Sequence, residues 1–156
     1  MSAEARLKEL GLTLPEMPAP IANYVRFKRV GDLVFLSGQG PRLADGTIPT
    51  GKVGNQPDSE VSVAEAYEHA KLTGLGLLAA MKEAAGSLDK VEVIKLLGMV
   101  NGDPTFGDQP KVINGCSDLL VAVLGERGRH ARSAVGMGSL PHNMTVEIEA
   151  IIRILP

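Results

Sequence analysis

Residues 144–155 read Met-Thr-Val-Glu-Ile-Glu-Ala-Ile-Ile-Arg-Ile-Leu, and this stretch decides the fold class. Apolar side chains alternate there with Glu147, Glu149 and Arg153, which is the period of a β-strand that buries one face. Residues 132–137, just upstream, are mostly small or apolar and predict another strand. The end of the chain therefore predicts two strands of a sheet.

Two amphipathic segments further upstream predict helices that lie across this sheet. The first begins at Ser62, which forms a capping box with Glu65, and its helical spacing of apolar residues continues to Gly86. The second, residues 108–125, opens on an aspartate and a proline. Residues 91–101 lie between them and predict a third strand, reached by a right-handed crossover.

Two further β-rich runs precede the first long helix. Residues 24–30 and 33–37 flank the turn Gly31-Asp32 and predict a hairpin. The second run is apolar throughout, so we expect it to be buried on both faces. The order is ββαβαββ, an α+β domain whose mixed sheet carries two helices on one face. The other face needs a cover, and the simplest cover is another copy of the chain.

The amino-terminal part reads as an extension of a single domain. Residues 3–10 have helical spacing and end before Gly11, and residues 12–20 hold three prolines that favour an extended connector. We therefore divide the chain into an extension at 1–20 and one domain at 21–156. Residues 38–58 form a long polar loop of the kind that often carries function.

Composition excludes several classes of partner. The chain has 156 residues and a formal charge of −2, with 3% aromatic residues, so we expect no nucleic-acid partner. It has no long apolar run, and its amino terminus is charged, so we expect no membrane partner and a cytoplasmic location. Cys116 is the only cysteine and lies on the apolar stripe of the second helix, which favours a core role.

No motif points to a metal or a nucleotide. His69, His130 and His142 lack the spacing of paired metal ligands, so we expect no metal site. Residues 46–52 have the spacing of a phosphate-binding loop, but Val53 stands where the hydroxyl that holds magnesium would be. No Gly-x-Ser-x-Gly elbow occurs either, which excludes that class of serine hydrolase.

Arg132 is a charged residue in an unusual position. It lies inside a predicted strand of small and apolar residues, where an unpaired charge is costly. It needs either an acidic partner, for which Glu147 on the next strand is the nearest candidate, or the carboxylate of a ligand. The spacing alone favours a structural ion pair and an active site equally.

Five motifs resemble, in order and spacing, those of the Rid (reactive intermediate deaminase) superfamily, often labelled endoribonuclease L-PSP. The resemblance covers about residues 21–154. It implies a chorismate-mutase-like fold, a homotrimer around a central barrel, and three active sites at subunit interfaces. The motifs are Asn23-Tyr24-Val25, Leu36-Ser37-Gly38-Gln39, Val112-Ile113-Asn114, Ala131-Arg132-Ser133 and Val146-Glu147-Ile148-Glu149-Ala150-Ile151.

The resemblance also implies roles for individual residues. Arg132 would grip the carboxylate of a 2-imino or 2-enamino acid, and Glu147 would position or activate water. Water would attack the imine carbon, and the carbinolamine would collapse to a 2-oxo acid and ammonium, without metal or organic cofactor. The residues that would line the substrate pocket are Tyr24, Ser37, Gly38, Asn114 and Ser133.

The chain also departs from the family pattern. Ala134 stands where many members carry a cysteine, and both the amino-terminal part and the 38–58 loop are longer than in compact members. A trimer that binds small carboxylate metabolites without turning them over therefore remains an alternative. RNA cleavage is disfavoured because no pair of histidines flanks a basic groove.

Overall fold

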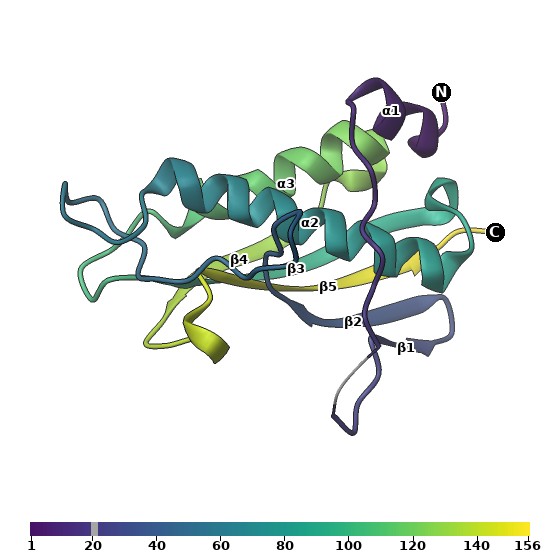
Figure 1. The fold of residues 1–156 in the computed structure, drawn as a ribbon. Helices are drawn as coiled ribbons and strands as arrows, with labels where there is room; N and C mark the ends of the chain where they lie inside the picture. The colour runs from purple at the N-terminus through teal and green to yellow at the C-terminus, as the bar shows by residue number, and fades with distance from the viewer. Residues whose placement is uncertain (20–21) are drawn as a thin grey trace.

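The protein is built on one mixed sheet of five strands. In the computed structural model, which describes residues 1–19 and 22–156, the strands lie in the order β1-β2-β5-β3-β4 (Figure 1). β3 and β4 are parallel, and the other neighbouring strands are antiparallel. This confirms the predicted α+β class and strand–helix order. The strands are β1 (Phe27–Val30), β2 (Leu33–Gln39), β3 (Val91–Asn101), β4 (Ala131–Met137) and β5 (Val146–Ile154).

Two long helices, α2 (Val63–Ala85) and α3 (Gln109–Leu124), lie side by side on one face of the sheet (Figure 1). The predicted capping box starts α2: Ser62 Oγ accepts from the Glu65 N–H at 3.2 Å, and Glu65 accepts from the Ser62 N–H at 2.8 Å. Gly115 of α3 lets the helices approach closely, because a side chain there would collide with the Tyr67 carbonyl of α2. The helices thereby form a continuous layer over one side of the sheet.

The other side of the sheet is covered by neither of the two long helices (Figure 1), and this corrects one expectation. β2 is not buried on both faces: Val34 and Leu36 are buried under the helices, whereas Phe35 is 45% exposed. Strand residues alternate between the faces, so a single helical layer buries only every second side chain. Val135 of β4 is also exposed, and Ile151 of β5 is half-buried.

Buried residues beneath the helices form the core. On β5 the alternation read from the sequence is confirmed, with Val146, Ile148, Ala150 and Ile152 all buried. Cys116 is fully buried in the same core, and burial raises the pKa of its thiol to about 12, which agrees with the expected packing role. Among the described residues, no helix combines the length and the apolarity needed to cross a membrane.

The amino-terminal part begins with α1 (Ala3–Glu9), which docks near the end of α3 (Figure 1). Ala3 and Leu7 are buried, whereas Leu10 is 48% exposed and lies just beyond the helix. From there an extended segment runs past α2 toward the edge of β1 (Figure 1). The domain start predicted near Ile21 falls outside the described residues, so the division at 20 and 21 stays a prediction.

Candidate functional site

Arg132 on β4 is held by one face of α3. Its Nη2 donates to Asn114 Oδ1 at 2.8 Å and to the Pro110 carbonyl at 3.3 Å. Its Nη1 donates to Ser117 Oγ at 3.0 Å. Positions 110, 114 and 117 recur at the spacing of one helix face, so the helix presents all three acceptors to the strand. The Arg132 guanidinium is therefore fixed in place within a single chain.

The positive charge of Arg132 is not neutralised by these contacts. All three acceptors are uncharged, and no carboxylate of the described residues lies within 4.0 Å of the guanidinium. Arg132 is half-buried, and a charge at such a depth without a partner is costly. Three contacts also leave some of the five guanidinium N–H donors unused. The arrangement suits the binding of an anion.

The interpretation of Glu147 as an ion-pair partner of Arg132 is wrong. β5 does not neighbour β4, because β3 lies between them and pairs with both. Arg132 is opposite Leu96 of β3, whereas Glu147 is opposite Met99. The two side chains also leave opposite faces of the sheet, since Arg132 reaches α3 while the neighbours of Glu147 on β5 are those buried under the helices.

Glu147 lies instead against a bulge in β2. The register between β2 and β5 shifts between Leu36 and Gln39. A Cβ on Gly38 would lie 2.9 Å from Glu147 Oε1, so a glycine is needed there for the carboxylate to take this position. Burial first, and repulsion from Glu149 second, raise the pKa of Glu147 above its usual value. A carboxyl group of this kind is suited to exchanging protons with a substrate.

Ser37 anchors the bulge to the segment before β1. Its N–H donates to the Arg26 carbonyl at 2.8 Å, and its hydroxyl donates to the Val25 carbonyl at 2.7 Å. β1 begins at Phe27 rather than at residue 24 as predicted, since a side-chain bond replaces the ladder bond at Val25. Tyr24 is 55% exposed and lies beside this anchor.

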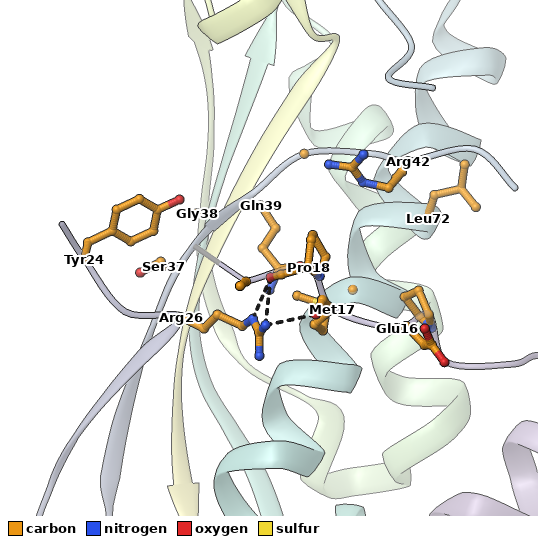
Figure 2. A pocket seen from close by; sticks show the side chains of 14 residues that line it. Glu16, Met17, Pro18, Tyr24, Arg26, Ser37, Gly38, Gln39, Arg42 and Leu72 are labelled. Carbon is orange, nitrogen blue, oxygen red and sulfur yellow. Dashed lines mark hydrogen bonds between the residues drawn. The ribbon is translucent and has the colours of Figure 1, made fainter. Parts of the chain in front are cut away.

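A cavity of about 330 Å³ opens next to the bulge (Figure 2). Tyr24, Ser37 and Gly38 line it, and so does the segment 15–19 of the amino-terminal extension. Arg26 holds that segment in place, because its guanidinium donates to the carbonyls of Met17 and Pro18 at 2.9 and 2.7 Å. The sequence indicated only a proline-rich connector here, and no local signal shows that the connector walls a cavity.

The predicted site residues therefore form two separate groups in one chain. Arg132 and Asn114 make the first group, which together with Ser117 we call the arginine cluster. Tyr24, Ser37, Gly38 and Glu147 surround the β2 bulge and make the second group, the bulge cluster. Ser133 is in neither contact set, because its hydroxyl accepts from Lys95 Nζ at 3.2 Å, and its role stays a prediction.

Sequence reasoning missed one member of the arginine cluster. Ser117 contacts the Arg132 guanidinium directly, although no motif marks it. Its spacing of three residues from Asn114 was the available signal, since positions separated by three share a helix face. His130, considered in the sequence only as a possible metal ligand, contacts Ser117 in turn, with its Nε2 3.0 Å from Ser117 Oγ.

Comparison with known proteins supports the fold described above. Residues 4–151 match the family model described as "YjgF/chorismate_mutase-like, putative endoribonuclease". The chain belongs to this family. The YjgF family match spans nearly the whole chain, from within the amino-terminal helix α1 to within the last strand β5.

Three relatives are similar over most of their length. The crystal structure of Atu1372 from Agrobacterium tumefaciens is 50% identical, has a TM-score of 0.86, and is matched over 97% of this chain and 91% of that one. "Protein TCP17" of Trypanosoma cruzi is 40% identical over 96% of this chain and 92% of its own. A "2-iminobutanoate/2-iminopropanoate deaminase" of Dermatophagoides farinae is 28% identical, over 92% of this chain and 94% of its own.

Proposed function

We propose that this YjgF-family chain hydrolyses reactive 2-imino and 2-enamino acids to 2-oxo acids and ammonium. One observation carries the proposal: Arg132 is a half-buried cation that α3 holds with three neutral acceptors and no carboxylate. Such a group binds the carboxylate of a small acid and fixes its orientation. A deaminase of this substrate class among the similar proteins supports the choice of reaction.

We further propose that each active site combines the arginine cluster of one copy with the bulge cluster of another, in a homotrimer. Arg132 and Glu147 cannot meet within one chain, because β3 separates their strands and their side chains leave opposite faces. The face opposite α2 and α3 carries Phe35, Val135 and Ile151, which a neighbouring copy would cover. A cyclic arrangement repeats the same heterologous contact three times.

The chemistry needs little beyond positioning and proton transfer. Arg132 binds the substrate carboxylate, and water adds to the imine carbon to form a C–O bond while the C=N bond becomes single. Glu147 accepts a proton from the attacking water and returns one to the nitrogen. The carbinolamine hydroxyl then gives its proton, through Glu147, to the amino nitrogen, and the C–N bond breaks as the C=O bond forms. The ammonia released takes up a proton from water, so that the products are a 2-oxo acid and ammonium. Burial and Glu149 raise the pKa of Glu147 above its usual value, which suits a group that both takes and gives a proton.

The test measures two quantities, the amount of imine that survives in the presence of the protein and the molecular mass of the oligomer. An amino-acid oxidase generates 2-imino acids in the presence of the protein, and semicarbazide traps the imine that remains. We expect less trapped imine with protein than without it, and light scattering should give about three times the 16.4 kDa chain mass. Unchanged trapping over a panel of small amino acids would instead favour the non-catalytic binder. A monomer or dimer would contradict the shared site.

A further inference from the structure

A network of hydrogen bonds connects Arg132 to Ser117, His130 and Gly128, three residues that lie outside the five sequence motifs. Ser117 Oγ lies 3.0 Å from Arg132 Nη1 and 3.0 Å from His130 Nε2. His130 Nδ1 lies 2.6 Å from the carbonyl oxygen of Gly128. Three elements contribute to this hydrogen-bond network: α3 supplies the serine, β4 the arginine, and the 3-10 turn η2 (Gly125–Gly128) the carbonyl.

The direction of each hydrogen bond follows from chemistry. A carbonyl oxygen only accepts, so the His130 proton must lie on Nδ1, and in the neutral ring Nε2 is then an acceptor. The Ser117 hydroxyl therefore donates to His130 Nε2. Its lone pairs remain free to accept from Arg132, which only donates. Neutral His130 thus orients the Ser117 hydroxyl so that it holds the Arg132 guanidinium.

We propose that Ser117 and His130 are positioning residues that aim the Arg132 guanidinium at the substrate carboxylate and make its grip depend on the protonation of His130. This inference rests on the proposed function of Arg132. It assigns roles to two side chains that touch neither the substrate nor the bulge cluster. It also predicts a pH dependence of binding that Arg132 alone cannot produce, because a guanidinium does not titrate in proteins.

Protonation of His130 would disturb this arrangement. Nε2 then becomes a donor, so Ser117 Oγ would face two donors, and an imidazolium would lie next to a guanidinium. Arg132 on β4 is the charged group that acts on His130, while α3 supplies the neutral Ser117 hydroxyl and η2 the Gly128 carbonyl. Burial lowers the pKa of His130, the hydrogen bond to Gly128 partly offsets this by raising it, and repulsion from Arg132 lowers it further. The neutral ring is therefore the form present at pH 7.

The test measures binding of 2-oxobutanoate, a 2-oxo acid, by calorimetry between pH 5 and 8, alongside imine turnover. Wild type should bind more weakly as the pH falls through the titration of His130. His130→Gln, which keeps an acceptor near the Nε2 position, should bind like wild type at pH 7.5 and lose that pH dependence. Ser117→Ala should bind roughly 10-fold more weakly at pH 7.5, with KM rising more than kcat falls.

Controls separate positioning from folding. Ser117→Thr keeps the hydroxyl and should restore most of the binding. His142→Gln, at an exposed histidine of the 3-10 turn at Pro141–Asn143, should leave the wild-type pH profile intact. Protonation of Glu147 changes binding with the opposite sign, because removing its negative charge favours a carboxylate ligand. The two titrations are therefore distinguishable.

Two outcomes would overturn the inference in different ways. If wild type turns over imines, but Ser117→Ala binds like wild type and His130→Gln keeps the pH dependence, the positioning role is wrong and the proposed function stands. If wild type neither binds 2-oxobutanoate nor shortens imine lifetime at any pH, the proposed function fails and the inference fails with it.

Discussion

Arg132 and Glu147 are both half-buried charged groups, but the fold surrounds them differently. The guanidinium is gripped by three acceptors from α3, whereas burial and Glu149 act on the carboxyl and no hydrogen bond lowers its pKa. The arginine cluster is thus rigid within one chain. The bulge cluster leaves its carboxyl in an environment that favours the neutral form. The surroundings of Arg132 thus suit binding of an anion, whereas those of Glu147 suit proton exchange.

Among the substitutions that test this comparison, Glu147→Gln should lower the activity most. Removing a general base and acid is expected to lower kcat by about 10²- to 10⁴-fold, with a smaller change in KM. Because the folded-state pKa of Glu147 is raised, its ionised form weakens the fold as the pH rises above the usual glutamate value. The melting temperature at pH 7 should therefore not fall. Full activity in this variant would remove Glu147 from the mechanism.

Arg132→Lys should come next. Lysine cannot reproduce the planar set of donors that contacts Pro110, Asn114 and Ser117, so we expect a loss of roughly 2 to 4 kcal/mol in transition-state binding. Arg29→Lys is a matched control, because Arg29 is exposed and donates only to the Gly31 carbonyl among the described residues. A destabilised variant whose folded fraction is fully active would show that Arg132 serves the fold alone.

Gly38→Ala should have an intermediate effect that is confined to the bulge cluster. The added methyl would lie 2.9 Å from Glu147 Oε1 and must displace a flexible carboxylate. We expect activity to fall about 10- to 100-fold through misplacement of that group. The stability loss should stay near 1 kcal/mol, measured by denaturant unfolding. Equal losses of activity in Gly38→Ala and Gly107→Ala, where the added methyl meets open space, would argue against a specific role for this contact.

The smallest expected effect concerns pH. If Glu147 must be ionised to act as a base, activity falls as the pH drops through its pKa, which burial and Glu149 raise. Glu149→Gln removes the repulsive part and should move the acid midpoint of kcat/KM to lower pH, with kcat at pH 8 nearly unchanged. A midpoint that does not move, or that moves to higher pH, would mean that another group controls the acid limb.

Much of the fold follows from local sequence patterns. The alternation on β5, the Ser62–Glu65 capping box and the Gly86 stop each correspond to an element that the structure contains. The order of the strands does not follow from such patterns, and β3 was not expected between β4 and β5. The exposure of Phe35 was not predicted for a related reason, since an apolar run does not say how many layers cover a strand.

Site residues could be predicted only where they belong to a recognisable sequence motif. Arg132 drew notice because a charge inside an apolar strand is costly, but its true partners lie on α3 and are close only in space. Ser117 has no motif, and its contact depends on how the helix is rotated over β4. The role of segment 15–19 as a cavity wall likewise depends on a long-range contact with Arg26.

The central claim is that the arginine cluster and the bulge cluster act on the same substrate from different copies of the chain. Co-expression of Arg132→Lys and Glu147→Gln chains with different tags, followed by purification through both tags, tests it directly. Each variant alone should be nearly inactive. In every mixed trimer one of the three interfaces joins an intact Arg132 to an intact Glu147, so activity should recover to about one third of the wild-type value per chain. Mixed oligomers that are no more active than the two parent variants would contradict the claim.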